Sequence, residues 1–159
     1  MYLPHHFGGA FLFLEFNMPQ FGKTSKERLA TCHPDLQLIL NTAIKTVDCS
    51  IFCGHRNNAN QNKAFDAGLS QVKWPDSKHN VFPSLAVDCG PYFPELRNTD
   101  WEDYKAFAVF AGYCMRIADE LLEKELITHR LRWGGDWDGD GRTADESFVD
   151  LPHFELVKI

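Results

Sequence analysis

The residue types best suited to chemistry are two histidines and one aspartate that lie far apart along the chain. His79 and Asp88 belong to the stretch SKHNVFPSLAVD at 77–88, and His153 lies near the C-terminus. Imidazole nitrogens and carboxylate oxygens are good Zn²⁺ ligands, and a catalytic zinc keeps three protein ligands plus a bound water. The three side chains therefore predict a zinc site, although a histidine near an aspartate is also a common hydrogen-bonded pair.

The segments around the first two residues predict a strand and a loop. Residues 85–89 form a short apolar, β-prone run that carries Asp88, while 80–84 contain a proline and polar residues that suit a loop. We therefore expect His79 on this loop and Asp88 on the strand behind it.

Amphipathic helices and further strands complete the expected domain. Apolar residues recur at helical spacing over 34–47 and again over 101–126. The longer helix is expected to follow a cap at Thr99 or Asp100 and to bury a face that includes Tyr104. The further strands are expected at 49–53, 130–133 and 148–157. In the last of these, His153 and Glu155 share one side because side chains alternate along a strand.

The amino-acid composition indicates the general class of protein. The 159 residues fit one domain, and 44% hydrophobic with 13% aromatic content indicates a folded globular protein. The net charge of -6 gives no electrostatic footprint for nucleic acid and no polybasic surface for anionic lipid. The five cysteines are odd in number and widely spread, which does not resemble a disulfide framework. Cys49 and Cys53 have the spacing of a metal pair but lack a matching second pair, so we expect buried, reduced thiols.

The first twenty residues are interpreted as an N-terminal extension, and 21–159 as the functional domain. The apolar run at 7–16 is far shorter than the ~20 residues of a membrane-spanning helix. It also lacks a basic n-region and a small-residue cleavage site, so we do not expect a signal peptide or stable membrane insertion. Met18 opens the polar, domain-like sequence, so the residues before it are an extension or follow an upstream start.

Several short motifs occur in the order found in a known family. They are GHR at 54–56, Gln61, SKH at 77–79, AVD at 86–88, WGGDW at 133–137 and DLPHFEL at 150–156. Together they resemble the zinc D-alanyl-D-alanine carboxypeptidase and L-alanyl-D-glutamate endopeptidase family, above all its single-domain phage and prophage endolysins. The resemblance covers about 21–157. It implies an α+β fold of the Hedgehog/DD-peptidase type, in which helices flank a small antiparallel sheet that carries the zinc site.

The family pattern implies roles for individual residues. His79, Asp88 and His153 become the ligands of one zinc per chain. Zinc lowers the pKa of a bound water toward ~7. Asp150 would take the proton from that water and return it to the leaving amine. Arg56, which could also be a surface charge, would orient the substrate or stabilise the oxyanion.

Three further residues are expected to support the ligands or to contact the substrate: Glu155, Gln61 and Ser77. The sequence also departs from the family's common form, which has a shorter turn between its histidine and aspartate. Here eight residues, 80–87, intervene. The longer loop should be tolerated if the strand register at Asp88 is kept, so the departure affects the expected loop shape more than the expected chemistry.

The resemblance also implies a substrate and a location. Family members cut peptides that contain D-amino acids in bacterial peptidoglycan stems. The leading hypothesis is therefore a monomeric L-alanyl-D-glutamate endopeptidase, held in the cytoplasm until a separate membrane pore releases it to the cell wall. A D,D-carboxypeptidase or dipeptidase of the same architecture is the main alternative. A non-catalytic, metal-containing binding module is the other, and the presence of Asp150 beside the full ligand set argues against it.

A second metal site is suggested by the acidic loop after WGGDW. Asp136, Asp138 and Asp140 alternate as oxygen donors do in the first half of a calcium loop. The second half fails, because Ser147 stands at the twelfth position, where a bidentate Glu is expected; Asp145 or Glu146 would have to substitute. The loop is thus either a non-standard Ca²⁺ site or a solvated acidic turn.

Overall fold

A four-stranded antiparallel sheet organises the computed structural model, which describes residues 18–159. The strands stand in the order β1-β2-β4-β3. Their bounds are β1 (Cys49–Cys53), β2 (Ala86–Pro91), β3 (Arg130–Trp133) and β4 (His153–Val157). The predicted N-terminal extension falls mostly on residues 1–17, which lie outside the described residues.

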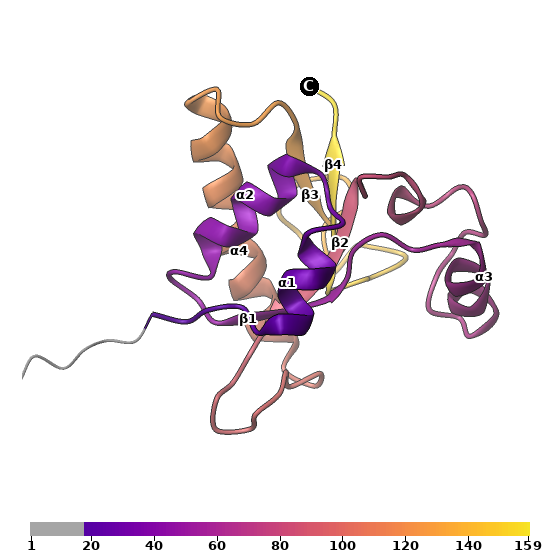
Figure 1. Ribbon diagram of the computed structural model, residues 1–159, viewed down its shortest axis with the longest axis horizontal. Helices are drawn as coiled ribbons and strands as arrows, with labels where there is room; N and C mark the ends of the chain where they lie inside the picture. Colours follow the sequence, from indigo (N-terminus) through magenta and orange to yellow (C-terminus); the bar gives the residue numbers. More distant parts are fainter. Residues whose placement is uncertain (1–17) are drawn as a thin grey trace, which may run out of the picture.

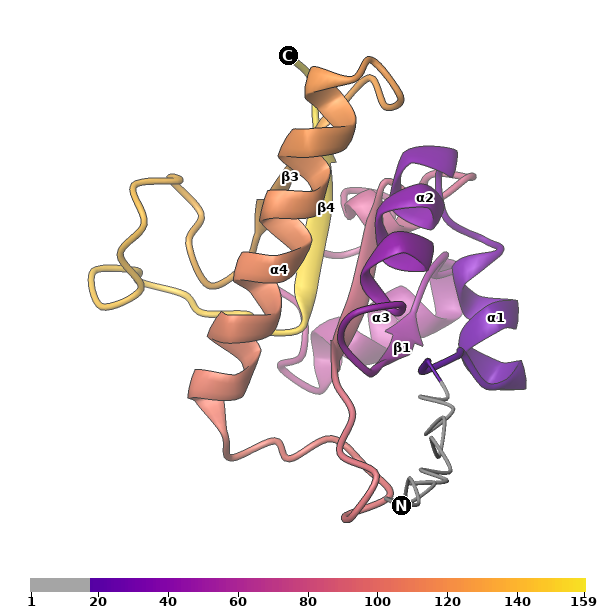
Figure 2. The same ribbon diagram turned by 90° about the vertical axis from the view of Figure 1, so that its left-hand side faces the viewer.

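Within residues 18–159, four α-helices and one 3-10 turn accompany the sheet: α1 (Lys23–Leu29), α2 (Pro34–Ala43), α3 (Asn58–Asp66), η1 (Lys78–Asn80) and α4 (Tyr104–Glu123). Helices α1, α2 and α4 gather over one face of the sheet, while α3 lies away from them (Figures 1 and 2). This arrangement confirms the expected α+β fold. Among residues 18–159, no helix is both long and apolar enough to cross a membrane.

Because side chains alternate along a strand, the two faces of the sheet carry different kinds of residue. On β4, Phe154 packs edge-to-face against Phe110 of α4, with ring centroids 5.9 Å apart. His153 and Glu155 alternate with Phe154 and therefore point to the opposite face. Asp88 lies directly across from His153 on β2 and shares that face. The helices thus cover the apolar face and leave the other for polar residues.

The long helix differs from its prediction at its start and in its buried face. It begins at Tyr104, because the Asp103 carboxylate caps it by accepting a backbone hydrogen bond three residues along (3.0 Å). Thr99 is instead buried and donates to the Pro91 carbonyl (2.7 Å), so neither Thr99 nor Asp100 is the cap. Tyr104 is exposed. The buried residues are Phe107, Phe110, Ala111, Cys114, Ala118 and Leu121.

Strand β2 runs two residues further than predicted, through Gly90 and Pro91. Pro91 pairs with Cys49 at the end of the ladder. A Cβ at Gly90 would lie 2.5 Å from the ring of Phe107. The glycine therefore lets α4 pack closely on the strand; it does not end the strand.

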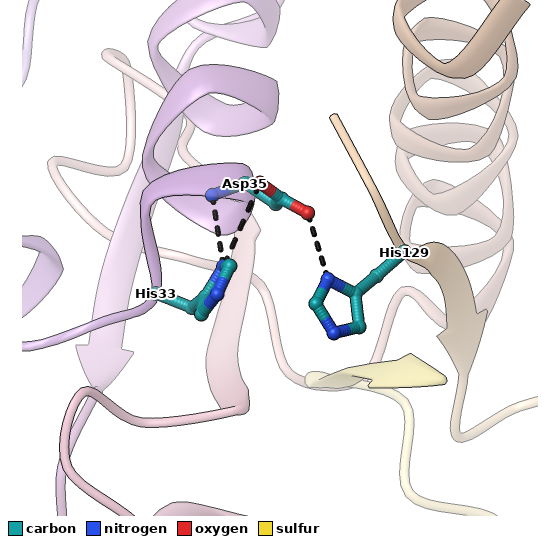
Figure 3. A group of neighbouring side chains, drawn as sticks. All are labelled: His33, Asp35 and His129. Atoms are coloured by element: carbon teal, nitrogen blue, oxygen red, sulfur yellow. Dashed lines mark hydrogen bonds and ion pairs between the residues drawn. The ribbon is translucent and has the colours of Figure 1, made fainter. Parts of the chain in front are cut away.

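A polar cluster ties the start of α2 to the segment before β3 (Figure 3). The Asp35 Oδ2 accepts from the Thr128 backbone N–H (2.9 Å) and lies 2.9 Å from His129 Nδ1. The His33 Nδ1 accepts from the Asp35 N–H (3.1 Å) and so caps α2. The spacing would also suit a metal ion. Because these atoms already have hydrogen-bonding partners, we interpret the cluster as a structural link.

This link predicts a pH-dependent contribution to stability. Burial opposes ionisation of Asp35, but hydrogen bonds from Thr128 and His129 outweigh burial and hold the pKa of Asp35 below its usual value. Its contribution is therefore complete above the unfolded-state pKa of about 3.9 and is lost as the pH falls through the folded-state pKa. We expect Asp35→Asn to lower the free energy of unfolding by about 1–3 kcal/mol near neutral pH and by less in acid.

Urea denaturation of both proteins at several pH values measures this difference. Asp66→Asn, which removes an exposed carboxylate at the end of α3, is the matched control and should change little. A difference between wild type and Asp35→Asn that stays constant from about pH 6 to about pH 2 would contradict the assignment.

Candidate active site

The three predicted ligands converge at one point on the face of the sheet opposite the helices. The His79 Nε2 lies 3.1 Å from Asp88 Oδ1 and 3.3 Å from His153 Nδ1. The His153 Nδ1 lies 3.2 Å from the same Asp88 oxygen. Two atoms that each lie about 2.0 Å from a tetrahedral ion are about 3.3 Å apart. The spacing of the donor atoms therefore fits a single small cation.

His79 lies in the three-residue 3-10 turn η1, within the connection where the sequence predicted a loop. Ser77 caps this turn, because its Oγ accepts from the His79 N–H (3.2 Å) while the Ser77 N–H donates to Asn80 Oδ1 (3.1 Å). The Nδ1 of His79 donates to the Gly54 carbonyl (2.7 Å). This bond sets the tautomer and leaves Nε2 free to act as a ligand. Ser77 thus acts on the backbone of the turn.

The long connection between His79 and Asp88 is tied down at Ser84. This buried residue donates its N–H to the Thr31 carbonyl (2.9 Å), and its own carbonyl accepts from the His33 N–H (2.9 Å). Backbone hydrogen bonds therefore hold the extra residues of this connection on the link between α1 and α2. Asp88 pairs directly with His153 in the β2–β4 ladder.

Arg56 is bound to Asp88. Its Nη2 lies 2.9 Å from Asp88 Oδ2, and its Nη1 donates to Gln61 Oε1 (3.2 Å). Gln61 is fully buried, and its Nε2 donates to Ser70 Oγ (2.9 Å) and the Val72 carbonyl (2.7 Å). Arg56 therefore orients the carboxylate of Asp88, and Gln61 positions Arg56.

The charges of the converging side chains stabilise one another. Burial opposes a charged imidazole, but the Asp88 carboxylate outweighs burial and raises the pKa of His79 to about 10. The pKa of His153 is raised as well, against its own burial, by hydrogen bonds to Asp88 and Glu155. Burial favours a neutral Asp88, yet the two imidazoles hold the pKa of Asp88 well below its usual value. The cluster is thus an anionic oxygen between two basic nitrogens.

Glu155 connects His153 to Arg132. Its Oε2 lies 3.3 Å from His153 Nε2, and its Oε1 accepts from Arg132 Nε (3.1 Å) and Nη2. Burial opposes its ionisation, but these partners lower the pKa of Glu155 to about 2. The charged Glu155 carboxylate binds Nε2 of His153 and so holds the ring with its Nδ1 facing Asp88.

The two tryptophans of the WGGDW motif hold the segment that precedes His153. The Trp133 Nε1–H donates to the Leu151 carbonyl (2.7 Å), and the Trp137 Nε1–H donates to the Phe148 carbonyl (2.8 Å). The Trp137 ring also packs on the His153 ring, with centroids 5.4 Å apart. The motif therefore supports the turn that leads into β4.

Gly134 completes this support and brings Asp150 to the site. Its N–H donates to the His153 carbonyl and its carbonyl accepts from the Asp150 N–H, both at 2.8 Å. Asp150 lines the same cleft as the three converging side chains. Burial and the nearby Asp88 charge raise the pKa of Asp150, which makes this carboxylate a stronger proton acceptor.

The Cys53 thiol also comes within 4.8 Å of possible ligand atoms of His79 and Asp88, which the sequence did not predict. A bulge between Ile51 and Cys53 places the thiol across from Asp88 in the β1–β2 pairing. The five cysteines are all free, and Cys53 alone is not fully buried. Cys53 does not line the cleft, whereas His153 does. Its position directly before the GHR motif was the available signal.

The acidic loop brings its three aspartates together, with one carboxylate oxygen of each within 4.8 Å of the others. These oxygens accept hydrogen bonds from backbone N–H groups of the same loop, at 2.8–3.2 Å. Glu146, and not Ser147, turns toward the loop, where its carboxylate accepts from the Trp137 N–H. The loop that contains Asp136, Asp138 and Asp140 is therefore held closed by its own hydrogen bonds.

A cleft of about 770 Å³ opens over the converging side chains. One wall is the segment around α3 and η1, and the other is the long 134–152 connection, which reaches away from the sheet (Figure 2). Aromatic side chains of Phe52, Trp101 and Trp137 line it together with charged groups. The cleft is large enough to admit a short peptide.

Comparison with known proteins decides the family. The family model described as phage L-alanyl-D-glutamate peptidase matches residues 17–157. The chain belongs to this family. The L-alanyl-D-glutamate peptidase of Escherichia phage T5 is 34% identical over 143 residues, which cover 87% of this chain and 98% of the relative. The crystal structure of Serratia marcescens L-Ala D-Glu endopeptidase ChiX matches with a TM-score of 0.66 and 27% identity. That match covers 91% of this chain and 94% of the other. The resemblance seen in the motifs is confirmed.

Close packing around Gly134 leaves no room for a larger residue at this position of the family's WGGDW motif. A Cβ there would lie 2.5 Å from the Asp150 carbonyl oxygen, which is backbone and cannot move without shifting the turn. We expect Gly134→Ala to lower the free energy of unfolding by about 1–3 kcal/mol. Chemical denaturation measures the change.

Gly112 of α4 provides the matched control, because a Cβ there meets nothing within 4 Å. Gly112→Ala should stabilise the protein by roughly 0.5–1 kcal/mol, since alanine is the better helix former. A Gly134→Ala protein as stable as wild type would show that the Asp150 turn is not held by this contact.

Proposed function

We propose that the protein is a zinc-dependent L-alanyl-D-glutamate endopeptidase that cuts peptidoglycan stems as a phage or prophage endolysin. The observation that carries the proposal is the convergence of His79 Nε2, Asp88 Oδ1 and His153 Nδ1 in a cleft that also holds Asp150. Family membership and the names of the T5 and Serratia relatives support the choice of bond.

The donor set suits a catalytic zinc. Two imidazole nitrogens and one carboxylate oxygen are zinc ligands, and a set of three leaves a coordination position open. His153 is preferred to Cys53 as the third ligand because it faces the cleft. When bound, zinc supplies a Lewis acid that polarises a carbonyl and lowers the pKa of a coordinated water to about 7.

The chain's own residues would do the rest of the chemistry. Asp150 accepts the proton of the water that attacks the scissile carbonyl, and later gives it to the leaving amine. Arg56 keeps the Asp88 carboxylate in place through its 2.9 Å contact and lines the cleft where it can meet the substrate. Glu155 orients His153 from behind.

A D,D-carboxypeptidase would use the same metal and acid residues, so it would differ from the endopeptidase only in the peptide bond that it cuts. The two relatives, both named for the L-Ala–D-Glu bond, favour the endopeptidase. The presence of Asp150 in the cleft argues against a non-catalytic binding module. A monomeric state, calcium binding by the acidic loop, and release from the cytoplasm through a separate membrane pore stay predictions.

Digestion of purified cell wall tests the function. Mass spectrometry should find new C-terminal L-alanine and new N-terminal D-glutamate among the products. Asp150→Ala should keep zinc and lower the rate by about 10²- to 10⁴-fold, because the proton acceptor is lost. Free D-alanine as the sole product would reject the endopeptidase, and unchanged lysis by Asp150→Ala would reject the role of Asp150.

The identity of the third ligand is tested by metal content. His153→Ala should lose most of its bound zinc, since a cleft-facing nitrogen is removed. Cys53→Ser should keep one zinc per chain and near-normal activity, because its sulfur lies outside the cleft. Elemental analysis of the purified proteins measures both, and the reverse pattern would assign the ligand to Cys53.

A further inference from the structure

We infer that Arg132 binds a free carboxylate of the substrate's D-glutamate residue, beside the bond that is cut. The inference rests on the proposed function and names a specificity contact in the same cleft. It follows from the chemistry of the substrate, the charges of the cleft and the partners of each cation.

The substrate carries an anion close to the scissile bond. In an L-alanyl-D-glutamate bond, the glutamate contributes its amine and keeps two carboxyl groups. A peptide chain continues through at most one of them. The other is a free carboxylate unless it is modified, and it lies only a few bonds from the scissile nitrogen. A site that cuts this bond has to accommodate that negative charge.

The lining of the cleft does not favour an anion in general. Apart from the two clustered histidines, three of its described residues are cationic: Arg56, Lys78 and Arg132. Five are carboxylates: Asp76, Asp88, Glu146, Asp150 and Glu155. A free carboxylate would be repelled by most of this lining unless a cation with donors to spare lies at its position.

The three cations differ in their exposure and in the donors that remain without a partner. Both Nη atoms of Arg56 bind protein acceptors, and its side chain is only 14% exposed. The Lys78 ammonium donates to the Leu156 carbonyl (2.9 Å). In contrast, the Arg132 side chain is 40% exposed. Its Nε and Nη2 both bind Glu155 Oε1, and within residues 18–159 its Nη1 has no acceptor.

The position of Arg132 suits a contact beside the reacting bond. It stands directly across from Glu155 in the β3–β4 pairing, and Glu155 contacts His153. The guanidinium lies 5.5 Å from the ring centroid of Trp137, which also packs on His153. These contacts hold the planar donor group in one orientation. A guanidinium held in this way matches a carboxylate better than a flexible ammonium does.

Two synthetic peptides that differ in one group test the contact. Both contain the L-Ala–D-Glu bond, and the carboxyl group of glutamate outside the chain is free in one and a primary amide in the other. We expect wild type to cleave the free-carboxylate peptide with a kcat/KM higher by roughly 10- to 100-fold. Arg132→Gln should lose this preference, because it should slow cleavage of the carboxylate peptide more than that of the amide peptide.

Arg130→Gln is the matched control. It removes the same charge two residues away on β3, outside the cleft, and should keep the preference of wild type. Zinc content of Arg132→Gln should stay at the wild-type level. The preference of wild type is itself a test that does not depend on any variant folding.

The outcomes separate the inference from the proposed function. Equal losses on both peptides in Arg132→Gln would show that Arg132 acts only through Glu155 and would overturn the inference. So would a wild-type protein that cleaves both peptides equally well. Cleavage of neither peptide by wild type would instead reject the proposed endopeptidase, and the role of Arg132 with it.

Discussion

The pairing of β2 with β4 is the constraint on which the site depends. Asp88 and His153 are directly opposed in this antiparallel pair, so their side chains leave the sheet next to each other on one face. A slip of one residue in either strand would turn its ligand toward the helices and bring an apolar side chain to the cleft. Burial of Val87 and Phe154 under the helices therefore also sets the position of the ligand atoms.

Contacts from several parts of the chain hold this pair in one geometry. Arg56 holds one oxygen of Asp88, and Glu155 holds the outer nitrogen of His153. His79 comes from a short capped turn, and its Nδ1 donates to a carbonyl of the segment after β1. Each ligand thus has a second partner that orients it. Such outer contacts restrict the rotamers of the ligands before any cation binds.

Local patterns predicted much of this arrangement. Strands β1 and β3 have the expected bounds, and the start of α2 at Pro34 was expected because proline suits a first helical position. Alternation along β4 correctly placed His153 and Glu155 together. The three converging residues were found because the chemistry of their side chains and the order of the surrounding motifs are visible without coordinates.

Features set by tertiary contacts were not predictable in this way. The strand that carries Asp88 was expected to end at residue 89, but it continues through Gly90, which makes room for the ring of Phe107. Thr99 or Asp100 was expected to cap α4, but Asp103 is the cap, and Thr99 is buried and donates to the Pro91 carbonyl. The approach of Cys53 to Asp88 depends on a bulge in β1, and the pairing of Arg132 with Glu155 depends on the register of β3 and β4. Each of these results from a partner distant in sequence.

Anomalous diffraction at the zinc absorption edge, from crystals of the zinc-loaded protein, tests the central claim most directly. We expect one strong peak within bonding distance of His79 Nε2, an Asp88 oxygen and His153 Nδ1. A peak bound by Cys53 in place of His153, or one found only between His33, Asp35 and His129, would contradict it.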